Sequence, residues 1–266
     1  MPELPEVEMA RRRLSRWCQR DDVVRVEVDK SRVARGSPLQ AFKRLRGRVG
    51  PVRRHGKQLA LAFEKGGTLL SHLGMTGKWV VRPVGVPVAH SRARLVLRSG
   101  KAVHYVDPRM FGRLEVARAA QVEAAFARLG PDLLLEPVTG KTLKARLADT
   151  ARPLKVALLD QARVAGLGNI HATEALFRSR LAPTRVARSL SEPEWARLAR
   201  GIRDALKYAL SLDDAHGDVE YLEEGRLKNP FLVYGRNGLP CRRCRRPIRS
   251  FTQAGRTTYE CPFCQR

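Results

Sequence analysis

Four of the five cysteines fall within the last 26 residues, as two pairs whose members are separated by two residues. Cys241 and Cys244 belong to CRRC, and Cys261 and Cys264 belong to CPFC. Thiolates at this spacing are typical of a tetrahedral zinc site on a β-hairpin. We therefore expect one structural zinc ion (Zn2+) per chain, stabilising a hairpin that is too small to fold alone. A redox pair or a chance grouping is the alternative.

The amino-terminal segment, MPELPEVEM, is a second candidate for chemistry. Met1 precedes a small residue, so we expect its removal, which leaves Pro2 as a free secondary amine. The pKa of an α-amino group is about 7.7–8.0, so part of it is neutral at pH 7 and can attack a carbon electrophile to form a Schiff base. Glu3 and Glu6 could transfer the protons. From the residues alone, an ordinary helix start is the more common use of such a segment.

The charge of the chain indicates a polyanionic partner. Lys and Arg number 51 against 26 Asp and Glu, which gives a net charge of +25. Such a charge repels itself in a compact protein, and it favours nucleic acid, whose phosphates release counterions when Arg and Lys bind them. From residue 236 to the end there are eight arginines and one acidic residue, so we expect this tail to bind DNA phosphates. A solvated basic face, or an anionic membrane surface, is the alternative, but no basic amphipathic helix or lipidation signal is found.

The elements that position these residues follow from periodicity. Val7, Ala10 and Leu14 recur at helical spacing behind Pro5, which predicts a first helix. Short β-rich runs between turns follow from about residue 22 to 118 and predict an antiparallel sandwich. Five helices are then expected, at 119–129, 140–148, 153–164, 170–178 and 192–210. The predicted fold is α+β, with domains at 1–118, 119–230 and 231–266.

The cellular location is predicted from what the sequence lacks. No apolar run approaches the roughly 18 residues of a membrane span. The first residues have neither the basic nor the apolar region of a signal peptide. We therefore expect a cytoplasmic protein, where disulfides rarely persist.

The amino-terminal PELPEVE resembles the opening of the formamidopyrimidine-DNA glycosylase and endonuclease VIII family. The resemblance continues in order through RRHGK (53–57), SHLGMTG (71–77), DPRMFG (107–112), LLDQARVAGLGNIHATEALF (158–177), VYGR (233–236) and GRTTYECPFCQ (255–265). It implies a two-layer β-sandwich with an amino-terminal helix, a helix-two-turns-helix domain and a zinc finger. It also implies a monomer that acts on damaged double-stranded DNA without an organic cofactor.

The resemblance assigns catalytic roles to four residues. Pro2 is the expected nucleophile at C1′ of the damaged nucleotide, and Glu3 the acid that protonates the sugar. Lys57 is expected to bind phosphate near the lesion and to be linked to β-elimination. Arg256 is expected to hold the same phosphates and to be linked to δ-elimination.

Further residues are expected to contact DNA. Met75, Arg109 and Phe111 match residues that fill the void left when a base is extruded, a step that costs a few kcal/mol. The alternative for Met75 and Phe111 is core packing. Asn169, interpreted as a helix N-cap, is expected to bind a phosphate. The remaining candidates are His90, Arg152 and Lys155, whereas Cys18, His104 and His171 are expected to be structural.

The implied activity is that of a bifunctional DNA glycosylase and abasic-site lyase of base excision repair. HLGMTG and DPRMFG resemble the branch that excises 8-oxoguanine and formamidopyrimidines. A lesion-capping loop is expected at 211–230, where the segment is unusually acidic, so a preference for oxidised pyrimidines or abasic sites stays open. A non-catalytic protein that binds damaged DNA is a further alternative, and a zinc-ribbon RNA-binding protein is disfavoured because it would leave Pro2 without a role.

Overall fold

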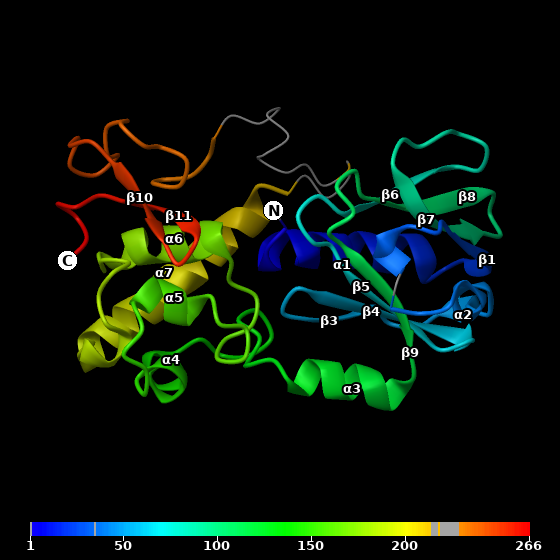
Figure 1. The fold of residues 1–266 in the computed structure, drawn as a ribbon, viewed down its shortest axis with the longest axis horizontal. Coiled ribbons are helices and arrows are strands. Elements are labelled where there is room, and N and C mark those ends of the chain that lie inside the picture. The colour runs from blue at the N-terminus through cyan, green and yellow to red at the C-terminus, as the bar shows by residue number, and fades with distance from the viewer. Residues whose placement is uncertain (1, 35, 214–217, 219–228) are drawn as a thin grey trace. The chain divides into compact units, whose positions relative to one another are not determined.

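The computed structural model describes all residues except 1, 35, 214–217 and 219–228. The chain forms two compact units (Figure 1). One comprises 1–128 with 213–223, and the other comprises 129–212 with 224–266. The three-domain division stays a prediction. The structure adds that the helix after residue 118 belongs with the β-sandwich and that the cysteine-rich tail belongs with the helices.

The first unit is an antiparallel β-sandwich around a buried helix, α1 (Leu4–Cys18). The order of hydrogen-bonded strands is β6-β8-β7-β1-β2-β4-β5-β9, and β3 pairs with β4. Figure 1 shows β6, β7 and β8 on one side of α1, with β3 and β4 on the other. The strands are β1 (Asp22–Val28), β2 (Arg46–Val49), β3 (Arg53–His55), β4 (Gln58–Lys65), β5 (Thr68–His72), β6 (Lys78–Pro83), β7 (Ser91–Leu97), β8 (Lys101–Val106) and β9 (Arg113–Ala117).

Helix α1 is buried because its apolar residues recur every three or four positions. Val7, Ala10, Leu14 and Cys18 all lie in the core between the two layers of strands. Three short helices complete this unit: η1 (Arg32–Ala34), α2 (Leu39–Lys43) and α3 (Ala119–Ala127). Val122 and Phe126 of α3 pack against Ala60 and Leu70, which explains why α3 belongs to the sandwich.

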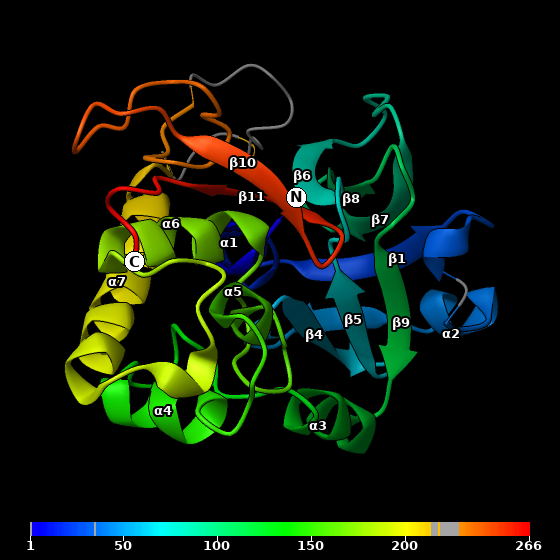
Figure 2. The same ribbon diagram turned by 60° about the vertical axis from the view of Figure 1, so that its left-hand side comes forward.

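The second unit combines helices with a two-stranded hairpin. Its helices are α4 (Gly140–Leu147), α5 (Leu154–Leu158), α6 (Asn169–Ser179), η2 (Ala187–Ser189) and α7 (Glu192–Ser211). The hairpin consists of β10 (Arg249–Gln253) and β11 (Arg256–Glu260), and Figure 2 shows it beside α6. Within the described residues, no helix is long and apolar enough to cross a membrane.

Two details of the helical region differ from the sequence predictions. The helix expected over 153–164 ends at Leu158, because Asp160 and Gln161 make side-chain bonds to the backbone that replace the helical pattern. Asn169 is not the N-cap of α6. Gly168 occupies that position, and Asn169 is the first helical residue.

Candidate nucleic-acid-binding and catalytic residues

Pro2 and Glu3 lie at the start of α1, and both are buried. Glu3 is the N-cap, with no exposed surface, and its backbone N–H donates to Glu6 Oε2 at 2.8 Å. A carboxylate at this end of a helix is stabilised by the helix dipole. A potential nucleophile and a potential acid therefore sit on a rigid element beside each other in the chain.

Arg54 connects α1 to the turn that carries Lys57. Its Nε donates to Glu8 Oε2 at 3.0 Å, and its Nη1 donates to the carbonyl of Gly56 at 3.1 Å. Burial acts to raise the pKa of Glu8, but hydrogen bonds from Arg11, Arg54 and Arg12 outweigh it and lower that pKa to about 2. Glu8 is thus a buried anion that ties the helix of Pro2 to strand β3. Nothing in RRHGK marks Arg54 as different from its neighbour, so sequence reasoning missed it.

Lys57 occupies the two-residue turn between β3 and β4. His55 pairs with Gln58, and Gly56 takes the positive φ of +55° that the turn requires. Across the sheet, Gln58 pairs with His72. Burial, with the positive charges of Lys57 and Arg113, lowers the pKa of His72 to about 4. His72 is therefore neutral at pH 7, and its Nδ1 accepts the N–H of Gly74 at 3.0 Å.

The loops that carry Met75 and Phe111 are joined by a buried aspartate, Asp107. Its Oδ1 accepts a bond from Thr76 Oγ1 at 2.6 Å, and its Oδ2 accepts the N–H of Gly112 at 2.8 Å. Its own N–H donates to the carbonyl of His90 at 3.0 Å. Asp107 thus fixes three segments at once, although the sequence marked it only as part of DPRMFG.

The side chains of these loops are displayed outward. Met75 is 38% exposed and Phe111 is 46% exposed, so the expectation that they are not core residues is confirmed. His90 and Arg109 are also exposed. Gly112 is required at the base of the loop, since a Cβ there would lie 1.8 Å from the Tyr105 hydroxyl oxygen. The first unit thus presents an apolar and cationic set of side chains suited to a nucleic acid.

In the second unit, Arg256 and Asn169 are linked by the hairpin backbone. Arg256 is exposed and directly follows the β10–β11 turn, in which Ala254 and Gly255 both have positive φ. Asn169 Nδ2 donates to the carbonyl of Thr257 at 2.9 Å. The first turn of α6 therefore supports the strand that begins with Arg256.

Lys155 does not reach the surface, which corrects the expectation that it contacts DNA. It is 1% exposed, and its Nζ donates to Thr258 Oγ1 at 2.6 Å and to the carbonyl of Thr257 at 3.3 Å. Its physical role is to support β11 from below. Arg152 differs, because its side chain is exposed and a 3.4 Å contact joins it to Asp160. Its DNA contact therefore stays a prediction.

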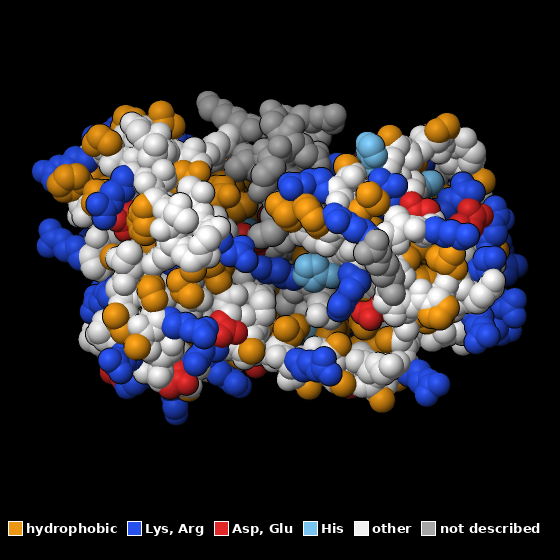
Figure 3. All heavy atoms as spheres, in the orientation of Figure 1, with side chains coloured by type: hydrophobic (Ala, Val, Ile, Leu, Met, Phe, Trp, Pro, Cys, Tyr) orange, Lys and Arg blue, Asp and Glu red, His pale blue; other side chains and the backbone are white. Residues whose placement is uncertain are grey.

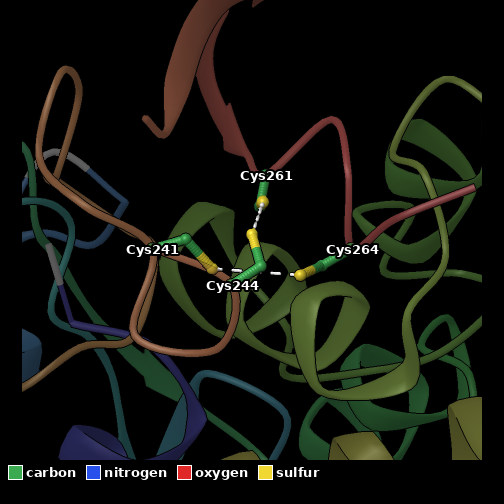
Figure 4. A group of neighbouring side chains, drawn as sticks. All are labelled: Cys241, Cys244, Cys261 and Cys264. Carbon is green, nitrogen blue, oxygen red and sulfur yellow. Dashed lines mark hydrogen bonds between the residues drawn. The ribbon is translucent and has the colours of Figure 1, made fainter. Parts of the chain in front are cut away.

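The four cysteines converge in the second unit, as Figure 4 shows. The Sγ atoms all lie within 4.8 Å of one another, with 4.0 Å between Cys241 and Cys264 and 3.5 Å between Cys244 and Cys261. Tetrahedral zinc with Zn–S bonds of about 2.3 Å requires sulfur separations of about 3.8 Å, whereas a disulfide requires about 2.0 Å. The donor set and its spacing fit a structural zinc ion.

Glu174 anchors the segment that precedes the cysteines. It is buried on α6, and its carboxylate accepts the backbone N–H groups of Leu232, Val233 and Tyr234 at 2.9–3.1 Å. Three consecutive backbone N–H groups thus converge on one side chain of α6. VYGR is therefore fixed to the helix that begins at Asn169.

On the face drawn in Figure 3, basic side chains are more prominent than acidic ones. The acidic segment predicted to cap the lesion, 211–230, lies mostly outside the described residues. Of its acids, Asp213 accepts two bonds from Arg13 and Asp218 pairs with Arg82. The residues expected to be structural, Cys18, His104 and His171, are all buried.

The chain matches family models of known proteins along most of its length. Residues 1–114 match the formamidopyrimidine-DNA glycosylase N-terminal domain, residues 129–219 its H2TH domain, and residues 238–266 a zinc finger found in FPG and IleRS. The chain belongs to the formamidopyrimidine-DNA glycosylase family. This confirms the resemblance, the fold class and the zinc-finger assignment.

Members of this family match the chain over nearly its whole length. The formamidopyrimidine-DNA glycosylase of Thermus thermophilus is 43% identical over 272 residues, covering all of this chain and 98% of the relative. The crystal structure of the MutM (Fpg) protein of T. thermophilus matches with a TM-score of 0.83 at 41% identity, over 99% of this chain and 98% of that one. Lactococcus lactis Fpg, solved with DNA containing N7-benzyl-Fapy-dG, matches with a TM-score of 0.86 at 30% identity, over 99% of both chains.

Proposed function

We propose that this member of the family excises oxidised purines, namely 8-oxoguanine and formamidopyrimidines, and then cuts the DNA strand. The chain is a DNA glycosylase of base excision repair by family. The observation that carries the purine preference is the pair of loops HLGMTG and DPRMFG, which share Asp107 and display Met75 and Phe111. The L. lactis relative, solved with a formamidopyrimidine lesion, supports it.

The reaction begins at Pro2. Its neutral nitrogen attacks C1′, and the N–C1′ bond forms as the glycosidic bond breaks and its electron pair leaves with the base. The nitrogen then releases its proton, which balances the charge taken up by the departing base. Glu3 then protonates O4′ as the sugar ring opens, which leaves an iminium (Schiff base) between Pro2 and C1′. Glu3 suits this role by position, since it is buried and directly follows Pro2 in the chain.

Strand cleavage follows from the acidity that the iminium confers on C2′. Loss of a C2′ proton expels the 3′ phosphate in the β-elimination, and a second elimination expels the 5′ phosphate. Lys57 and Arg256 neutralise these phosphates, and hydrolysis of the Schiff base frees Pro2. No organic cofactor takes part. A structural zinc ion held by the four cysteines would fix the hairpin that carries Arg256.

The remaining predicted DNA contacts are His90, Arg109, Asn169 and Arg152. Each is proposed to bind phosphate or, for Arg109, to fill the void beside Met75 and Phe111. The enzyme is proposed to act as a monomer in the bacterial cytoplasm, where its substrate is the chromosome.

Trapping with borohydride tests the proposal. Protein shown by mass spectrometry to lack Met1 is incubated with duplexes containing 8-oxoguanine, a formamidopyrimidine, dihydrouracil or an abasic site. We expect a covalent adduct, fastest with the purine lesions, which Glu3→Gln slows and the exposed control Glu123→Gln does not. Faster trapping with dihydrouracil would transfer the chain to the pyrimidine branch. Absence of any adduct, despite DNA binding, would favour the non-catalytic alternative.

A further inference from the structure

Arg32 contacts the loop that carries Arg109 and Phe111, although no sequence motif contains it. It begins η1, whose next two residues, Val33 and Ala34, are buried and anchor it. Its Nε donates to the carbonyl of Met110 at 2.6 Å, and its Nη2 donates to the carbonyl of Arg109 at 2.7 Å. The guanidinium carbon also lies 4.7 Å from the centre of the Phe111 ring.

The loop needs such support because its backbone is strained. Met110 has a φ of +54°, a conformation that L-residues other than Asn and Asp rarely adopt, and its side chain packs against the core. This arrangement turns the neighbouring Arg109 and Phe111 outward. The Arg109 guanidinium lies 4.9 Å from the centre of the Phe111 ring. The planar guanidinium of Arg32 thus donates to two consecutive carbonyls and lies beside an aromatic ring. An ammonium group cannot reproduce this planar arrangement of donors.

We propose that Arg32 is a positioning residue for base excision, which holds Arg109 and Phe111 ready to enter the void left by the extruded base. The inference rests on the proposed function, because an ordered loop matters only if its side chains replace the damaged base when that base is extruded. The competing role for an exposed arginine in a basic protein is a direct phosphate contact. The two roles differ in what a lysine can replace: a phosphate contact tolerates Lys, whereas the bidentate, stacked arrangement does not.

The first test compares Arg32→Lys and Arg32→Ala with Arg98→Ala, an exposed arginine paired with Asp22 on another part of the sheet. Single-turnover excision of 8-oxoguanine is measured at saturating enzyme, beside β-elimination at a preformed abasic site. We expect both Arg32 variants to slow excision by about tenfold or more, the effect of losing a charge-assisted hydrogen bond, with a much smaller change at the abasic site. The control and the unfolding midpoints should stay unchanged.

Salt dependence separates positioning from phosphate binding. Loss of one phosphate contact lowers the slope of log Kd against log salt by about one, so a phosphate role predicts that slope change for Arg32→Ala and wild-type excision for Arg32→Lys. Either result would overturn the positioning role. If the wild-type protein neither excises 8-oxoguanine nor is trapped on it, the proposed function itself fails.

A double-mutant cycle with Phe111→Ala completes the test. If Arg32 acts through the loop, the loss of excision in the Arg32→Ala, Phe111→Ala double variant should be smaller than the product of the two single losses, and what remains beyond Phe111→Ala should come from Arg109. Multiplicative losses would show that Arg32 acts independently of Phe111 and would refute the inference.

Discussion

Replacing Glu8 with Gln removes the carboxylate that Arg54 contacts in the core of the β-sandwich. Arg53 and Arg54 are consecutive on β3, so their side chains point to opposite faces of the strand. Arg54 pairs with buried Glu8, whereas Arg53 pairs with Glu123, which is 59% exposed at its side chain. Glu8→Gln and Glu123→Gln therefore make the same chemical change in two ion pairs, one buried and one exposed.

The size of the effect at Glu8 follows from its pKa. A decrease from 4.5 to about 2 corresponds to about 3 kcal/mol of stability at pH 7, at about 1.4 kcal/mol per pKa unit. Loss of one partner from a buried ion pair costs a similar 3–5 kcal/mol or so, because the other charge is left uncompensated. The folded pKa lies below the unfolded value, so this stability is present above pH 4.5 and is lost as the pH falls through 2. At pH 3 about 1.4 kcal/mol remains.

Thermal unfolding followed by circular dichroism measures the difference. At pH 7 we expect Glu8→Gln to lower the unfolding midpoint by about 6–12 °C, from about 2–4 °C per kcal/mol for a protein of this size. Glu123→Gln should leave it within error of the wild type. The gap between the two variants should narrow at pH 3. Equal midpoints at pH 7, or a gap that widens in acid, would refute the assignment of Glu8 as a buried stabilising anion.

Three further results are expected. The pKa of His72, measured by NMR, should lie near 4 and should rise when Lys57 is replaced by Ala. Because the folded state favours neutral His72, its contribution to the stability of the fold should be lost as the pH falls from 6.5 to 4. An unchanged pKa in Lys57→Ala would contradict the proximity of Lys57. Cys261→Ser should release the bound zinc, measured by a colorimetric chelator, and weaken DNA binding, whereas zinc retained at one per chain would exclude this ligand. Arg152→Ala should lower the slope of log Kd for DNA against log salt by about one. Lys155→Met should leave that slope unchanged and lower the unfolding midpoint. A lower slope with an unchanged midpoint in Lys155→Met would restore Lys155 as a DNA contact.

Much of the fold was predictable because the long elements have clear periodicity. The short β-rich runs expected from about residue 22 to 118 form strands, including β5 and β8, and the apolar stripe of α1 is buried as predicted. The short elements were missed. Strand β3 has only three residues and reads as RRH, which looks like an exposed basic turn. Its strand character comes from pairing with β4, and Arg54 is buried because it contacts Glu8 of α1.

The candidate residues were predictable by type but not by environment. Lys155 illustrates the limit, because the partners that bury it, Thr257 and Thr258, lie about a hundred residues further along the chain. A basic composition indicates that many cations face DNA, but it cannot indicate which of them support the fold. In contrast, the cysteines were correctly grouped because zinc ligation has a characteristic local spacing.

The residues that sequence reasoning missed share one physical property: each makes hydrogen bonds to the backbone of a loop and not to a ligand. Asp107 accepts a backbone N–H of one loop while it bonds a threonine hydroxyl of another, and Arg54 and Arg32 donate to carbonyls within the turns that carry Lys57 and Phe111. An enzyme that replaces a stacked base with its own side chains needs those side chains held in place beforehand, since ordering them at the moment of extrusion would cost about 0.5–1.5 kcal/mol each. A buried carboxylate that accepts a loop N–H, and arginines that donate to loop carbonyls, hold these side chains in place. Their partners are brought together only by the folded sandwich, so these residues become recognisable from the structure and not from any single motif.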